Sequence, residues 1–221
     1  MAAITPTRAM DEYRRNQAAL GGRVAVGAAA LVRMRLVPED PDRGWADLLA
    51  ELLELIRGGR NVSERLAMEF YRYLREVEDA AGPPPDEPAT EFPTDAVVGS
   101  MIWTGPRMAK AMRRRGDDTN LPGRVGVMVG RSAMRHTLNG GRRVIRGQVL
   151  DDGSAWGWAR VTDADPCEFC KMLASRGPVY KSARSAGRVD LHRYHDGCGC
   201  NVVPLFKSAD RASRRGLPRG V

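Results

Sequence analysis

Two short segments decide the fold of the C-terminal part: DPCEFC at residues 165–170 and HDGCGC at residues 195–200. They contain all four cysteines of the 221-residue chain and one of its three histidines. A CxxC pair directs two sulfurs at one centre, and a second pair at HxxC spacing completes the tetrahedral N/S set of a structural zinc site. The sequence therefore predicts a structural Zn²⁺ site with five candidate ligands, Cys167, Cys170, His195, Cys198 and Cys200.

The spacing leaves the fourth ligand open. Cys167, Cys170, His195 and Cys198 form the simplest set, but Cys200 can replace Cys198 because a two-residue shift along an extended chain keeps the same face. Two disulfides are unfavourable in a cytoplasmic chain. A redox CxxC would leave the second cysteine pair unexplained, and four inert thiols would not explain the clustering.

A metal is also expected from the size of this part of the chain. Residues 157–206 contain few large apolar side chains, and a module of about 50 residues buries too little surface to be stable alone. Zinc binding would supply folding free energy. It would also close the loop between Cys170 and His195, which we expect to present a basic surface with Tyr180, Arg184, Arg188 and Arg193.

The front half of the sequence predicts helices. Apolar residues recur at helical spacing over residues 8–36, although three glycines make two shorter helices possible. A leucine-rich stripe covers residues 48–56, and Gly58 and Gly59 are predicted to end that helix. Asn61 or Ser63 is then expected to cap the next helix.

The back half begins as helix and changes after Gly153. Residues 121–144 are predicted to be helical, and their glycines lack the GxxxxGK[ST] pattern of a phosphate-binding loop. His136 is expected to be a structural residue. Strands are expected at residues 156–162, 179–180 and 202–203, where β-branched and aromatic residues are concentrated.

Charge and proline content divide the chain. Residues 1–81 carry 12 basic and 13 acidic side chains, whereas residues 97–221 carry 23 and 10. Between them, residues 82–93 contain five prolines and are expected to be an extended spacer. The predicted organisation is a helical region at 1–81, a linker at 82–96, a basic helical region at 97–153, a zinc module at 154–206 and a basic tail at 207–221. The fold class is mostly α with a small C-terminal α+β zinc-stapled module.

Several classes of protein are excluded. No apolar run approaches the 18 residues that a membrane span needs, so no membrane partner is expected. The first residues lack a signal peptide pattern, which predicts a start in the cytoplasm. A zinc deaminase needs an HxE motif ahead of its PCxxC, but His136 is followed by Thr137 and Leu138. There is no GxSxG motif and no other nucleophile pattern beside a histidine, so no catalytic residue is predicted.

The run GWARVTDADPCEFCKMLASRGPVY at residues 157–180, followed by HxxCxC and Val-Val-Pro, resembles the phage Mu F-like minor head protein family. It more closely resembles the version in tailed phages of actinobacteria. The family signature is a CxxC followed by His-Pro-x-Cys-Arg-Cys. Here Asp196 replaces the proline and Gly199 replaces the arginine.

This resemblance implies a low-copy structural component of the virion near the portal, acting in head morphogenesis or DNA packaging and delivery. The implied partners are the portal or major capsid protein, with packaged DNA facing the basic C-terminal half. The implied location is the phage head, after assembly in the host cytoplasm. A capsid maturation protease and a zinc-dependent nucleic-acid-binding protein are the alternative functions.

Overall fold

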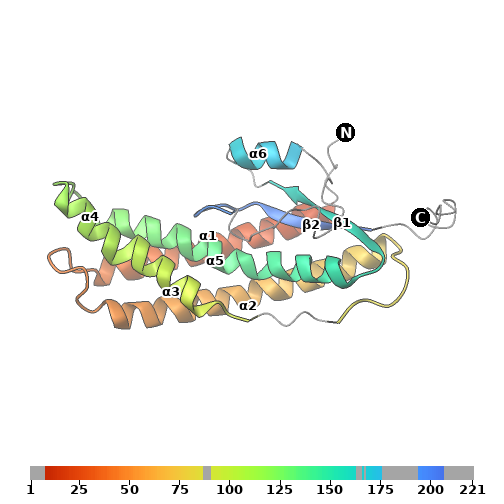
Figure 1. Cartoon of the computed structure of the whole chain (residues 1–221), viewed down its shortest axis with the longest axis horizontal. Helices are drawn as coiled ribbons and strands as arrows, with labels where there is room; N and C mark the ends of the chain where they lie inside the picture. Colours follow the sequence, from red (N-terminus) through yellow and green to blue (C-terminus); the bar gives the residue numbers. More distant parts are fainter. Residues whose placement is uncertain (1–7, 87–90, 163–165, 167, 176–193, 207–221) are drawn as a thin grey trace, which may run out of the picture.

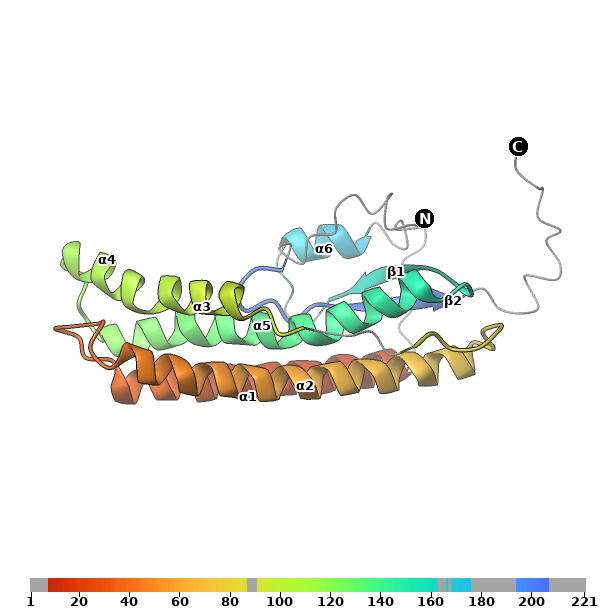
Figure 2. The same cartoon turned by 60° about the horizontal axis from the view of Figure 1, so that its bottom comes forward.

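A computed structural model describes residues 8–86, 91–162, 166, 168–175 and 194–206 of the chain. Three long helices, α1 (Arg8–Arg35), α2 (Trp45–Val77) and α5 (Leu121–Asp151), lie side by side (Figures 1 and 2). The described helices include none that is both long and apolar enough to cross a membrane.

Two of the sequence expectations about helix ends are wrong. The helix does not end at Gly58 and Gly59, and Ser63 does not cap a new one, because α2 continues through all three residues. Gly59 is buried where a Cβ atom would lie 2.8 Å from Val24 of α1 and 3.0 Å from Thr137 of α5. Tertiary packing therefore requires a glycine inside this helix, and its low helix propensity does not stop the helix.

The backbones of α1 and α5 approach each other closely. A Cβ atom at Gly130 would lie 2.4 Å from the carbonyl oxygen of Ala25, and one at Gly126 would lie 2.8 Å from that of Ala29. The glycines that the sequence excludes from a phosphate loop thus serve helix packing. The three glycines of α1 do not divide it, since it runs unbroken over 28 residues.

A buried polar layer separates the apolar core into two clusters. Gln17 of α1 donates to the backbone oxygen of Ser63 at 3.0 Å, and the Ser63 hydroxyl donates to Gln17 Oε1 at 2.8 Å. The backbone N–H of Gly141 donates to the same hydroxyl at 3.1 Å. One apolar cluster extends from Leu20 to Ala133, and the other contains Met10, Phe70 and the inner faces of two strands.

A second helical layer covers the N-terminal half of α5. It consists of α3 (Thr94–Ile102), a π-helical turn η1 (Trp103–Arg107) and α4 (Met108–Arg114). Gly105 has non-helical backbone angles, and the ring of Trp45 lies where its Cβ atom would be. This layer shares one apolar cluster with the three long helices.

The C-terminal module packs against the other half of α5 (Figure 2). Its strands β1 (Ala155–Val161) and β2 (Asn201–Phe206) pair antiparallel, and the short helix α6 (Glu168–Ser175) contacts β1. These strands confirm two of the three expected strands, while residues 179–180 lie outside the described residues. The predicted class, mostly helical with a small C-terminal α+β module, is confirmed.

Candidate metal centre

Three cysteine side chains converge between α6, β1 and β2. Cys170 comes from α6, and Cys198 and Cys200 come from the segment that leads into β2. All three are buried, and their sulfur atoms lie within 4.8 Å of one another. The sulfurs of Cys170 and Cys198 are 3.6 Å apart, too far for a disulfide of about 2.05 Å. Two sulfurs bound to one tetrahedral zinc ion at about 2.3 Å lie about 3.8 Å apart, so this spacing fits a metal site.

A tight turn brings the second cysteine pair into position. The N–H of Cys198 donates to the carbonyl of His195 at 3.1 Å, and Gly197 adopts a φ of +82° inside this turn. That left-handed conformation favours glycine. The N–H of Gly197 donates to the carbonyl of Arg131 at 3.0 Å, which fastens the turn to α5. A Cβ atom at Gly197 would lie 2.6 Å from the Arg131 side chain.

Asp196 provides a second attachment. Its carboxylate accepts a hydrogen bond from Arg135 Nε at 2.6 Å, and Arg135 Nη2 donates to the hydroxyl of Ser100 at 3.2 Å. The turn is therefore linked to α5 directly and to α3 through one arginine. Asp196 thus has a structural role in this chain.

Arg142 provides the third and most buried attachment. Its guanidinium donates to the backbone carbonyls of Cys198 at 2.7 Å and Cys200 at 2.7 Å. Another nitrogen donates to the side-chain oxygen of Asn139 at 2.9 Å. Arg142 lies on α5 and is 1% exposed. One buried side chain therefore fixes the backbone of both cysteines.

Tyr194 belongs to the same buried cluster as the three cysteines and contacts two arginines. The guanidinium carbons of Arg142 and Arg160 lie 3.7 and 4.2 Å from the ring centre of Tyr194, within the range of cation–π attraction. Arg160, on β1, also approaches the sulfur of Cys170 at 3.7 Å. A hydrogen bond from Cys200 and the charge of Arg142 lower the pKa of Cys198 to about 5, although burial acts in the opposite direction. The environment therefore favours a thiolate, which is the metal-binding form.

The predicted ligands occupy different positions relative to this cluster. The structure brings Cys170, Cys198 and Cys200 together. His195 is exposed, and its Nδ1 atom lies 3.0 Å from the carbonyl oxygen of Asp196. Cys167 and the basic loop that contains Tyr180, Arg184, Arg188 and Arg193 lie outside the described residues.

Sequence reasoning missed the arginines and Tyr194. Arg142 lies 56 positions before Cys198, and no spacing rule connects a residue on one long helix to a distant cysteine motif. His136 is buried, and burial, followed by the nearby charge of Arg135, lowers its pKa to about 4. It is therefore neutral at pH 7.

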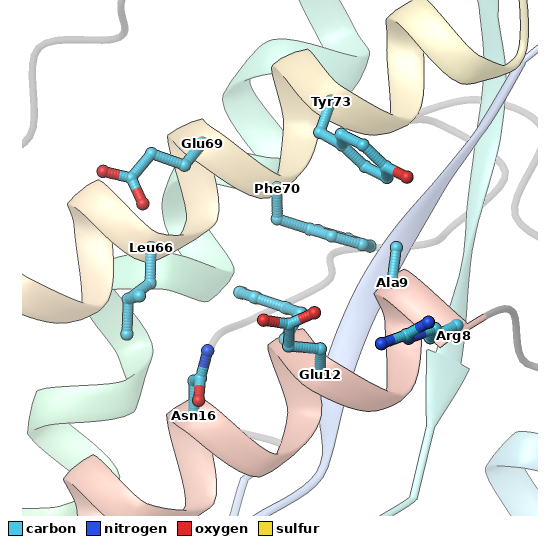
Figure 3. Close-up of a pocket in the computed structure, with 9 residues that line it drawn as sticks. Arg8, Ala9, Glu12, Asn16, Leu66, Glu69, Phe70 and Tyr73 are labelled. Atoms are coloured by element: carbon cyan, nitrogen blue, oxygen red, sulfur yellow. The ribbon is translucent and has the colours of Figure 1, made fainter.

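The described residues also line two surface hollows. The larger, of about 470 Å³, lies between α1 and α2 over the stacked rings of Tyr13 and Phe70 (Figure 3). Among the residues that line it there is no cysteine, serine, threonine or histidine. The remaining lining is mixed and consists of Arg8, Ala9, Glu12, Asn16, Leu66, Glu69 and Tyr73. The smaller, of about 350 Å³, lies beside the Arg135–Asp196 ion pair. Neither hollow contains the cysteine cluster.

Comparison with known families accounts for nearly the whole chain. The model of the VG15 protein family matches residues 4–217. The chain belongs to this family. This VG15 chain is 25% identical over 235 aligned residues to the Gene 15 protein of Mycobacterium phage L5, a match that covers 89% of this chain and 77% of that protein.

A second relative is the Gene 15 protein of Mycobacterium phage D29. It is 36% identical over 105 aligned residues, covering 34% of this VG15 chain and 38% of the relative. Both relatives are phage proteins, so VG15 is a phage protein family. No solved structure matches this chain.

Proposed function

We propose that this VG15 protein is a minor head protein of a tailed phage, of the Mu F-like type, present in low copy number near the portal. The three-cysteine cluster is the observation that carries this proposal. It lies at the positions on which the resemblance to minor head proteins rests, and the matched relatives are themselves phage proteins.

The centre fits a structural role for zinc. Three soft sulfur donors meet in a buried site, as zinc prefers. The groups around them hold the backbone in place rather than open a position for substrate. Bound zinc would join α6 to the segment before β2, which hydrogen bonds already fix to α5. We propose that this fixed surface serves assembly.

The proposed partners are the portal or major capsid protein and packaged DNA. An exposed basic run, Arg113 to Arg115, lies at the end of α4 and supports contact with DNA. Such contact would weaken steeply with salt. A measurement of DNA binding therefore requires the full chain, because α3, α4 and α5 share their apolar cluster with α1 and α2.

Particle composition tests the virion assignment. Quantitative mass spectrometry of purified phage should detect this protein at a small, fixed ratio to the portal protein. A phage lacking the gene should yield defective heads, and a plasmid copy should restore them. Absence from washed particles, together with normal heads in the deletion strain, would contradict the proposal. Cleavage of capsid or scaffold protein by the purified chain would favour the protease alternative.

A further inference from the structure

Two arginines near the cysteine cluster have no acidic partner among the described residues. Arg142 is 1% exposed, and the hydrogen bonds of its guanidinium go to two carbonyls and one amide oxygen, all neutral. Arg160 approaches the sulfur of Cys170 and the ring of Tyr194. A buried cation without a compensating negative charge is costly. Among the described residues, thiolates of the cysteine cluster would supply this charge.

The charge of the cluster depends on its ligands. A zinc ion with three thiolates and a neutral imidazole has a net charge of minus one, whereas zinc with four thiolates has minus two. The two positive charges of Arg142 and Arg160 equal the net charge of minus two of the four-thiolate site in magnitude. Three protonated thiols would provide no negative charge, whereas thiolates, the metal-binding form of cysteine, would balance the guanidiniums.

The positions of the side chains agree with this charge. Cys198 and Cys200 are two residues apart in the segment that leads into β2. Both sulfurs are within 4.8 Å of the other sulfurs, which makes the two cysteines simultaneous ligands rather than alternatives. His195 is exposed, and its ring nitrogen contacts a backbone carbonyl.

We propose that the zinc centre is coordinated by thiolates alone. Cys170, Cys198 and Cys200 bind the metal together, His195 lies outside the ligand set, and Arg142 and Arg160 are positioning residues that balance the negative charge. The CxxC spacing of the sequence predicts Cys167 as the fourth ligand. This inference rests on the zinc-binding part of the proposed function and is independent of the location in the virion.

Cobalt substitution tests the ligand set. Metal-free, reduced full-length protein is titrated with Co²⁺, and absorption is recorded in the charge-transfer and d–d regions. One Co²⁺ per chain and the long-wavelength d–d bands of a four-sulfur site are expected. His195→Ala should leave the spectrum unchanged and the affinity within about threefold. Cys200→Ser should weaken binding by about a hundredfold and reduce the charge-transfer intensity.

The reverse pattern would overturn the proposal. A loss of affinity and a shift of the d–d bands in His195→Ala, with little effect of Cys200→Ser, would show a three-sulfur, one-nitrogen site. Absence of cobalt binding would exclude the metal centre itself. Either result would leave the virion assignment intact, since particle composition tests that assignment separately.

The charge role of the arginines has its own test. Removing the positive group beside Cys170 in Arg160→Met should shift the sulfur-to-cobalt charge-transfer band to lower energy and weaken Co²⁺ binding about tenfold, as changes around metal ligands do. Arg142→Lys, which keeps the charge, should retain more affinity than Arg142→Met. Arg143→Met, on the same helix, is the control. Equal spectra and affinities in all four variants would contradict a charge-balancing role for Arg142 and Arg160.

Discussion

At Gly130 a single absent methyl group sets the distance between α1 and α5. In Gly130→Ala the new Cβ atom would meet the carbonyl oxygen of Ala25 at 2.4 Å, so the helices must separate. We expect the free energy of unfolding to fall by about 1–3 kcal/mol, the usual cost of overpacking. Urea unfolding followed by circular dichroism measures this change.

Gly58 offers a matched control for this substitution. It lies inside α2, and nothing is within 4 Å of its added Cβ atom. Gly58→Ala should therefore raise the free energy of unfolding by up to about 1 kcal/mol, because alanine has the higher helix propensity. Effects of the same sign at Gly58 and Gly130 would contradict the close-approach explanation.

At the residue scale, sequence reasoning grouped residues that are close in the sequence and missed pairs that are distant in it. It excluded a phosphate loop from the glycines near residue 126, and it singled out Cys170, Cys198 and Cys200. It missed the reason for Gly130, because the partner of that residue, Ala25, lies on another helix. Arg142 was missed for the same reason, since burial and helix packing decide which residues meet.

At the scale of elements, Asp152 joins the ends of α2 and α5 to the proline-rich segment. Its carboxylate accepts hydrogen bonds from Tyr71 and Arg75, each at 2.8 Å. Arg75 also donates to the backbone carbonyls of residues 81–83. Burial alone would raise the pKa of Asp152, but hydrogen bonds from Arg75, Ser154 and Tyr71 lower it to about 2.

Because of this depressed pKa, the free energy of unfolding depends on pH in the acidic range. An Asp carboxyl titrates near pH 3.9 in the unfolded chain. The ionised form therefore adds about 2 kcal/mol above that pH, and this contribution is lost as the pH falls from about 4 to 2. Asp152→Asn should lower the free energy of unfolding by about 2–4 kcal/mol at pH 7, with a smaller difference from the natural protein at pH 2.

Asp151→Asn is the matched control, because Asp151 is exposed on the same helix. It should change the free energy of unfolding by less than about 0.5 kcal/mol at either pH. Urea unfolding at both pH values provides the measurement. A constant difference between Asp152→Asn and the natural protein across this range would show that the charge of Asp152 contributes nothing.

The elements themselves were largely predictable from periodicity. Apolar residues at helical spacing indicated α1 and most of α2, and alternation indicated β1. The error at Gly58 and Gly59 arose because glycine commonly ends helices, whereas here Val24 and Thr137 require its small size. Local propensity cannot show such a requirement, since it comes from neighbours on other helices.

At the scale of the whole molecule, metal removal should loosen the module and spare the bundle. A chelator under reducing conditions should speed hydrogen exchange about tenfold or more in residues 155–161 and 201–206, which corresponds to about 1.4 kcal/mol of local stability. The segments of α1 and α2 around Leu20 and Leu52 should change little, because they belong to the other apolar cluster. Hydrogen-exchange mass spectrometry of the full chain measures both regions.

Two variants on α6 accompany this measurement. Cys170→Ser should reproduce the effect of the chelator, whereas Met172→Ser, at a position 40% exposed, should not. A uniform change along the chain would show that the metal stabilises the whole molecule rather than its module. No change in any segment would show that the module does not depend on metal.

The position of α5 in the sequence has a consequence for synthesis on the ribosome. All residues of α1 to α5 precede the first cysteine, and N-terminal units tend to fold first as the chain emerges. We therefore expect the carbonyl of Arg131 and the side chains of Arg135 and Arg142 to take their places before the cysteine cluster assembles on them. Metal capture would then be the last step in the maturation of the newborn chain, on a surface prepared in advance.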